Sequence, residues 1–175
     1  MEQAELWTIG HSTRSAEEFA ALLQENRIEV LADVRRFPGS RRYPHFNDGN
    51  LRPFLSQHGI TYEHFPELGG RRTPLKDSPN TAWRNAAFRG YADYMMTGEF
   101  AKAAARLLET AAQKRTSVMC AESLWWQCHR ALVADYAKAR GVKVSHILGP
   151  RKVEEHPYTS AAQIIDGQLS YRGIL

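Results

Sequence analysis

Short apolar runs alternate with helix-like segments along almost the whole chain, and this alternation constrains the fold more than any other feature. The run 28–34 (IEVLADV) is nearly continuously apolar, as a strand covered on both faces should be. Before it, Ser15 and Glu18 form a capping-box pair that marks the start of a helix. Further apolar runs occupy 5–9, 60–65, 116–120 and 142–148, and helical patterns occupy 16–26, 50–57, 88–96, 99–113 and 128–140.

This alternation predicts an α/β fold of three layers, with a mostly parallel open sheet of the Rossmann-like or flavodoxin-like kind and flanking helices. We expect one α/β domain over residues 1–175, with a core of about 4–148 and a C-terminal extension over 149–175. Within the extension, the pattern predicts a short helix near 159–165 and an edge strand at 168–171.

We expect a cytoplasmic protein. No run approaches the roughly 20 apolar residues that span a bilayer, so no membrane partner is expected. The first ten residues, MEQAELWTIG, lack the basic and apolar regions of a signal peptide. The two cysteines, without secretory context, indicate a reducing compartment and not a disulfide framework.

Polar residues and glycines follow four of the expected strands. Because ligands of open α/β sheets bind beyond the carboxyl ends of the strands, we expect these residues to share one site. They are Gly10-His11-Ser12 after the first strand, Asp33 and Arg35 after the second, Gly69-Gly70 after the third, and Cys120 and Glu122 after the fourth.

Both cysteines lie in the segment 120–130, together with Glu122, His129 and Arg130. Cys120 at a strand end, or Cys128 near a helix start, could be a reactive thiolate, with Glu122 or His11 as proton carrier. The spacing from Cys120 to Arg130 does not match the Cys-x5-Arg loop of phosphatases. Alternatively Cys128 packs toward the core, since cysteine is among the most buried residue types. Zinc binding by both cysteines and His129, with His11 or Asp33, is a further alternative, although structural zinc sites usually have closer cysteine pairs.

Arginines gather in the loop after the second strand and again after the third. Arg35 and Arg130, with the Gly69-Gly70 turn, could hold a phosphate. Aromatic side chains nearby could stack on a base. The net charge of +4 is too small for an extended duplex-binding face. The arginines are Arg35, Arg36, Arg41, Arg42, Arg52, Arg71 and Arg72, and the aromatic residues are Trp125, Trp126, Tyr43 and Phe46.

These motifs together resemble the DUF488 family of small bacterial and archaeal proteins, whose name marks the absence of a settled function. The resemblance spans roughly residues 6–148 and implies an α/β fold with a shared site along the motifs, but no known reaction. The matching pieces are Thr8-Ile9-Gly10-His11-Ser12, Asp33-Val34-Arg35 with Pro38, Ser40-Arg41 and Phe46, Gly59-Ile60-Thr61-Tyr62, Leu68-Gly69-Gly70, Cys120-Ala121-Glu122 and Cys128-His129-Arg130.

The sequence therefore predicts an enzyme, a hydrolase or transferase, that acts on a small phosphate-bearing ligand or a nucleic-acid end. A non-catalytic nucleotide sensor or protein-interaction module, and a Cys/His metal-binding protein, are the alternatives. No metal ligand is assigned, no cofactor is specified, and a homo-oligomer stays open. The expected catalytic residues are Cys120, Glu122 and His11; the expected ligand-binding residues are Ser12, Asp33, Arg35, Arg41, Gly69, Gly70, Cys128, His129 and Arg130.

Overall fold

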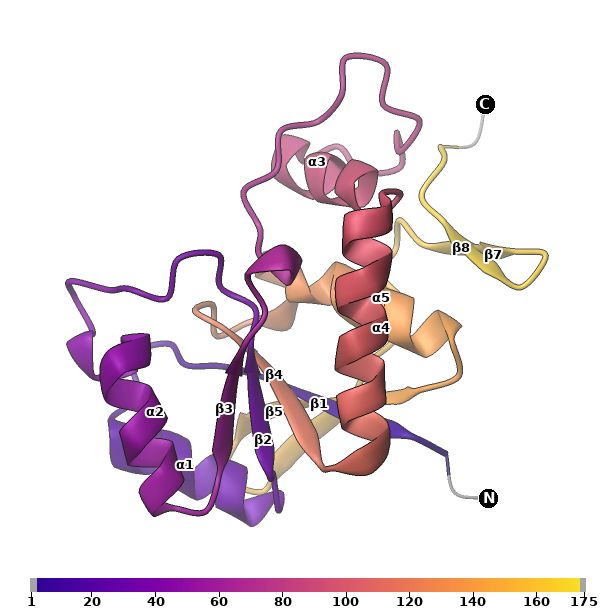
Figure 1. The fold of residues 1–175 in the computed structure, drawn as a ribbon. Coiled ribbons are helices and arrows are strands. Elements are labelled where there is room, and N and C mark those ends of the chain that lie inside the picture. Colours follow the sequence, from indigo (N-terminus) through magenta and orange to yellow (C-terminus); the bar gives the residue numbers. More distant parts are fainter. Residues whose placement is uncertain (1–2, 174–175) are drawn as a thin grey trace.

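A computed structural model of the chain, which describes residues 3–173, has a six-stranded sheet at its centre. The strand order is β3-β2-β4-β1-β5-β6, and the first five of these strands are parallel (Figure 1). β6 runs antiparallel to β5 and forms one edge. The strands are β1 (Glu5–Gly10), β2 (Val30–Asp33), β3 (Thr61–His64), β4 (Thr116–Cys120), β5 (Lys143–Gly149) and β6 (Lys152–Glu155).

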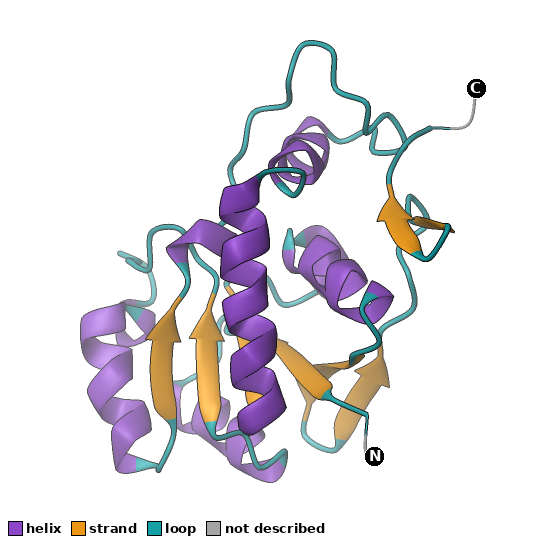
Figure 2. Cartoon of the chain, turned by 45° about the vertical axis from the view of Figure 1, so that its right-hand side comes forward, coloured by secondary structure: helices purple, strands orange, loops and turns teal. Residues whose placement is uncertain are grey.

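Helices cover both faces of this sheet, so the predicted three-layer α/β fold is confirmed (Figure 2). One face carries α1 (Ala16–Glu25) and α2 (Asp48–Gln57). The other carries α3 (Ala86–Tyr94), α4 (Gly98–Gln113) and α5 (Arg130–Ala139). Three short 3-10 helices lie in the loops: η1 (Pro44–Phe46), η2 (Pro66–Leu68) and η3 (Trp125–Gln127).

Local sequence explains why the elements begin where they do. The side chain of Ser15 accepts a hydrogen bond from the backbone N–H of Glu18, and the Glu18 carboxylate accepts one from the N–H of Ser15, as the capping-box motif predicts. β2 and β4 are buried along their whole length because they lie inside the sheet with helices on both faces. None of the helices within residues 3–173 is long and apolar enough to cross a membrane.

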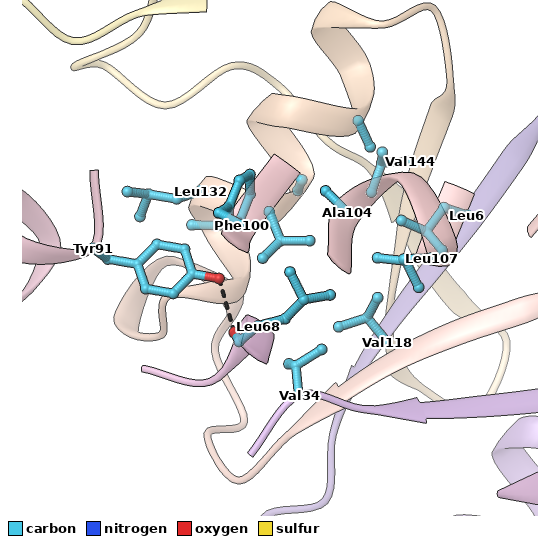
Figure 3. Close-up of a cluster of buried hydrophobic side chains, with 14 of the residues drawn as sticks. Leu6, Val34, Leu68, Tyr91, Phe100, Ala104, Leu107, Val118, Leu132 and Val144 are labelled. Atoms are coloured by element: carbon cyan, nitrogen blue, oxygen red, sulfur yellow. Dashed lines mark hydrogen bonds between the residues drawn. The ribbon is translucent and has the colours of Figure 1, made fainter. Parts of the chain in front are cut away.

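Two apolar cores lie on the two faces of the sheet. The core under α1 and α2 includes Phe19 and Leu51, and the core under α4 and α5 includes Phe100 and Leu132. In the second core the hydroxyl of Tyr91 donates a 2.8 Å hydrogen bond to the carbonyl of Leu68, which fixes α3 to the end of η2 (Figure 3).

The C-terminal extension differs from the prediction. The helix expected near 159–165 is absent, and the strand at the end of the extension does not join the central sheet. Instead β7 (Gln163–Ile165) and β8 (Gln168–Ser170) form a separate hairpin. Its two-residue turn is Asp166-Gly167, with φ of 51° and 77°. An Asp-Gly pair is a strong hairpin signal because both positions of this turn need positive φ, and the apolar spacing at 161–165 obscured it.

Candidate functional site

The loops that follow β1, β2 and β4 meet at the carboxyl edge of the sheet, as predicted. The backbone N–H of His11 donates to the carbonyl of Cys120 at 2.9 Å, and that of Ser12 donates to the carbonyl of Ala121 at 3.0 Å. The N–H of Val34 donates to the carbonyl of Met119 at 3.0 Å. The main chains of three predicted motifs are therefore joined directly.

The sheet nevertheless separates the predicted side chains into two groups. Asp33 is in register with Met119, whose side chain packs in the core under α1 and α2. Cys120, one residue further along β4, packs in the opposite core. Successive side chains of a strand point to opposite faces, so Asp33 and Cys120 lie on different sides of the sheet. No hydrogen bond within residues 3–173 links the side chain of His11 to that of Cys120 or Glu122, the three predicted catalytic residues.

On the α1/α2 face, the guanidinium of Arg35 forms a buried ion pair with Asp33. Its Nε and Nη2 donate to the two carboxylate oxygens at 2.9 and 2.8 Å, and Nη2 also donates to the carbonyl of Phe46 at 2.7 Å. The hydroxyl of Tyr62 donates to the same carboxylate, and burial, followed by the charge of Asp33, raises the pKa of that phenol. Sequence reasoning gave Arg35 to an anionic ligand, but the protein itself occupies most of its donors.

His11 lies on this face as well, stacked on Phe46 with ring centroids 4.4 Å apart. Its Nδ1 donates to the carbonyl of Ser12 at 2.9 Å; because a carbonyl can only accept, Nδ1 carries the proton and Nε2 is the basic nitrogen. Burial lowers the pKa of His11 to about 4, so the ring is neutral at physiological pH. Ser12 turns the chain here, with φ of 51°.

On the opposite face, Cys128 lies at the start of α5 in contact with His129. The Cys128 sulfur is 3.4 Å from Nδ1 of His129, and Nε2 of that ring is 3.2 Å from the carbonyl of Val34. Since the carbonyl requires a donor, Nε2 carries the proton and Nδ1 is free to accept the thiol proton. Burial lowers the pKa of His129, which keeps the ring neutral. The Cys128 thiol, the His129 base and the Val34 carbonyl that orients this base are thus joined by successive contacts.

The two thiols have different acidities. Burial would raise the pKa of Cys128, but a hydrogen bond from Cys120, the backbone N–H of Arg130 and the charge of Arg130 outweigh this effect and lower it. Burial, and then the hydrogen bond to Cys128, raise the pKa of Cys120 well above its usual value. The pair therefore favours a thiolate on Cys128 and a protonated thiol on Cys120.

Arg130 is completely buried, with 0% of its surface exposed. Its Nη2 donates to the carbonyl of Ser123 at 3.0 Å, while Nε and Nη1 have no partner. The ion pairs within residues 3–173 are Arg35–Asp33 and His156–Asp135, so no carboxylate neutralises Arg130. A buried charge without a counter-ion is costly, and the neighbouring Cys128 thiolate can supply that counter-ion.

Three further buried donors also lack partners: Nε of Arg14, in the loop after β1, Nε1 of Trp83, and Nε1 of Trp125, in η3. Sequence reasoning missed Arg14 and Trp83, and it assigned Trp125 only to base stacking. Burial lowers the pKa of Arg14, and the positive charge of Arg130 lowers it further. Nη2 of Arg14 donates to the carbonyl of Leu148 at 3.2 Å. Arg14 follows the His11-Ser12 motif by two residues, a signal that could have brought it into the predicted set.

The Gly69-Gly70 turn is needed for close packing. A β-carbon on Gly69 would lie 2.6 Å from Cβ of Arg36, and one on Gly70 would lie 2.9 Å from Nδ1 of His129. The turn therefore packs against His129, the base beside the Cys128 thiol, and does not present its own backbone to an anion. Of the other predicted residues, Glu122 and Arg41 are exposed.

A buried polar chain behind the site was also missed. Asp135 on α5 accepts hydrogen bonds from His156 at 2.8 Å and from the hydroxyl of Tyr171 at 2.7 Å. His156 in turn contacts His146 at 2.8 Å, and the His146 ring stacks on Trp125 with centroids 4.6 Å apart. Burial, then the charge of His156, lower the pKa of His146 to about 2. This series of buried polar contacts connects η3 to the C-terminal extension. No local sequence pattern indicates the connection.

No group of three or more His, Cys, Asp or Glu residues in the described part of the chain is arranged to hold a metal ion. Cys120, Cys128 and His129 lie together, but Asp33 and His11, which the metal alternative would add, point to the other face of the sheet.

No curated protein and no solved structure matches the chain. A family model does match: that of the domain of unknown function DUF488, over residues 15–137. The match includes both cysteines, His129 and Arg130, and it leaves the His11-Ser12 motif and most of the buried histidine chain outside. Since the match covers well over half of the 175 residues, the chain belongs to the DUF488 family.

Proposed function

We propose that this protein is an enzyme, a hydrolase or transferase, in which Cys128 is the nucleophile and His129 its base, and that its substrate bears a phosphate. The sequence favoured Cys120 for the nucleophile. The geometry supports Cys128 instead, because its sulfur contacts an imidazole nitrogen free to accept a proton, whereas the thiol of Cys120 donates to the backbone carbonyl of Glu122. Glu122, exposed in the loop after β4, remains as a proton carrier at the rim of the site, whereas His11 lies on the other face of the sheet and has no role in this proposal.

The first half-reaction follows from these contacts. Cys128 gives its proton to Nδ1 of His129, and the thiolate attacks the substrate and displaces a leaving group, which takes up a proton. The transferred group is then held covalently on the sulfur. Water in a hydrolase, or an acceptor hydroxyl or amine in a transferase, displaces the group and restores the thiolate. The Val34 carbonyl holds the His129 ring in the tautomer that these reaction steps require.

The observation that carries the proposal is the buried Arg130 guanidinium beside Cys128, with two free donors and no carboxylate partner. A phosphate oxygen satisfies such donors better than a neutral group does, because hydrogen bonds between ionised partners are about twice as strong as neutral ones. The unpaired Nε of Arg14 and the first turn of α5 add to the attraction for an anion. Residues 121–127, whose members are largely exposed, form the cover that a ligand must displace to reach them.

Protection of the thiol tests the proposal. Alkylation of Cys128 by iodoacetamide should slow severalfold in the presence of inorganic phosphate or a nucleoside monophosphate, and not in sodium chloride of equal ionic strength. Arg14→Ala should weaken the protection, whereas Arg151→Ala, which removes an exposed arginine between β5 and β6, should not. Equal alkylation rates with phosphate and chloride would overturn the assignment of a phosphate-bearing substrate.

A further inference from the structure

The loop between β2 and η1 is strongly basic. Residues 35–46 include four arginines and no aspartate or glutamate. Arg35 is used internally, but Arg36, Arg41 and Arg42 are exposed, and so is Arg71 in the loop after η2. A cluster of one sign, without interspersed acids, attracts a polyanion and is unusual for a face that only solubilises the protein.

Two exposed aromatic side chains lie in the loops that follow β2 and β4. The side chain of Phe37 is 69% exposed and that of Trp126 is 50% exposed. They are the two aromatic residues among the exposed large hydrophobic residues of the described chain. Neither fills a core: the Arg36 guanidinium lies 5.6 Å from the centroid of the Phe37 ring, and Trp126 makes an edge contact with Trp125. The exposed surface of each ring is available to stack on a planar partner.

Basic and aromatic residues stand at the same edge of the sheet as Cys128. The loops that carry them follow β2, β3 and β4, whose carboxyl ends lie together (Figure 1). Nη1 of Arg36 donates to the carbonyl of Arg71 at 3.4 Å, which joins two of the loops. Gly70, adjacent to Arg71, packs on His129. We name this surface the arginine rim; it consists of Arg36, Phe37, Arg41, Arg42, Arg71 and Trp126.

We propose that the arginine rim binds single-stranded nucleic acid, so that the phosphate presented to Cys128 belongs to a nucleic-acid strand and not to a free nucleotide. The proposal rests on the proposed function for the identity of the reacting group, but not for the binding itself. Alternation of arginines with accessible aromatic rings is the chemistry that holds a single strand, with phosphates paired to the cations and unstacked bases on the rings. Paired bases of a duplex would leave Phe37 and Trp126 without partners.

Fluorescence anisotropy with a labelled mixed-sequence 12-nucleotide strand tests the binding, with the corresponding duplex and heparin as competitors. Phe37→Ala and Trp126→Ala leave the charge unchanged, and each should weaken binding of the single strand by about fivefold or more, the effect of losing one stacked base. Val153→Ala, at an exposed apolar residue of β6, is the matched control and should have no effect. Unlabelled duplex should compete less well than unlabelled single strand.

The charge variants give a second, independent readout. Arg41→Ala combined with Arg42→Ala should weaken binding and flatten its salt dependence by about 1.4 in the slope of log K against log salt, as expected for two lost phosphate contacts on a single strand. Lys114→Ala combined with Lys143→Ala removes the same charge at the opposite edge of the sheet and should leave the slope unchanged.

Each outcome decides the proposal. Equal affinity for strand, duplex and heparin, with no effect of the aromatic variants, would reduce the rim to a non-specific polyanion surface and overturn the proposal. Binding to vesicles of anionic phospholipid but not to the strand would overturn it in favour of a lipid surface. Cys128→Ser should bind the strand as well as the wild-type protein does. Strand binding by a protein whose Cys128 proves unreactive would therefore retain the rim and reject the proposed function.

Discussion

The backbone carbonyl oxygen of Glu122 stands 1.7 Å from the point where a β-carbon on residue 10 would be, and Gly10 is the residue that makes this possible. The end of β1 and the loop after β4 can therefore approach to hydrogen-bonding distance, as the bonds from His11 and Ser12 show. The close approach of these two backbones places the Cys120–Cys128 loop over the sheet edge.

Gly10→Ala should destabilise the protein by at least about 2 kcal/mol, because the loop after β4 must move to admit the methyl group. Gly49→Ala is the control, since nothing lies within 4 Å of the added atom and the position is in a helix, where alanine is favoured. Urea unfolding of the two variants measures the difference. Equal stabilities would mean that the contact between Gly10 and Glu122 does not form.

Arg35→Ala should cost about 3–5 kcal/mol in the free energy of unfolding, because it leaves the fully buried Asp33 carboxylate without its cation. Arg41→Ala, in the same loop but exposed, should stay within about 0.5 kcal/mol of the wild type. Chemical denaturation at pH 7 compares them. A small effect of Arg35→Ala would show that Arg35 is available to a ligand after all.

Stability should fall as the pH decreases below about 6.5, and His11 should contribute to this fall. Burial lowers the pKa of folded His11 from 6.5 to about 4, so between these values the unfolded chain binds a proton that the folded protein does not. The resulting stabilisation is present above pH 6.5 and is lost as the pH falls toward 4. His11→Gln should reduce the slope of unfolding free energy against pH in this window by up to about 1.4 kcal/mol per unit. An unchanged slope would contradict a buried, neutral His11.

Asp135→Asn should destabilise the protein by about 2 kcal/mol or more and should expose the C-terminal extension to proteolysis, because Asp135 accepts hydrogen bonds from both His156 and Tyr171. Asp166→Asn changes an exposed aspartate in the turn of the β7–β8 hairpin and should have little effect, since asparagine also tolerates positive φ. Limited chymotrypsin digestion, followed by mass spectrometry of the fragments cut after Tyr158, Leu169 and Tyr171, measures the exposure. Equal digestion of the two variants would show that Asp135 does not anchor the extension.

The strand positions and their convergence were predictable because they depend on local patterns. The apolar run at 28–34 and the capping box at Ser15 contain enough information to place β2 and α1, and parallel strands necessarily share their carboxyl edge. That is why the motifs of His11, Asp33 and Cys120 were correctly brought to one edge.

The division of those motifs between two faces was not drawn from the sequence, because it depends on the register between strands. Asp33 faces α1 and α2 because it aligns with Met119 and not with Cys120, and pattern alone does not give that alignment. The partners of Arg35 and Arg130 depend on tertiary packing in the same way. Arg35 forms an ion pair with the carboxylate of Asp33, whereas Nε and Nη1 of Arg130 have no partner. Asp135, His146 and Tyr171 are far apart in the sequence, so only the fold brings them together.

The reactivity of Cys128 tests the central claim most directly. The rate of iodoacetamide labelling at each cysteine, resolved by peptide mass spectrometry between pH 5 and 10, should give Cys128 an apparent pKa below that of glutathione measured in the same buffers. Cys120 should be labelled only after unfolding, and His129→Gln should slow labelling of Cys128. If both cysteines stay protected until the protein unfolds, or if Cys128 titrates at or above the glutathione value, Cys128 is not the nucleophile.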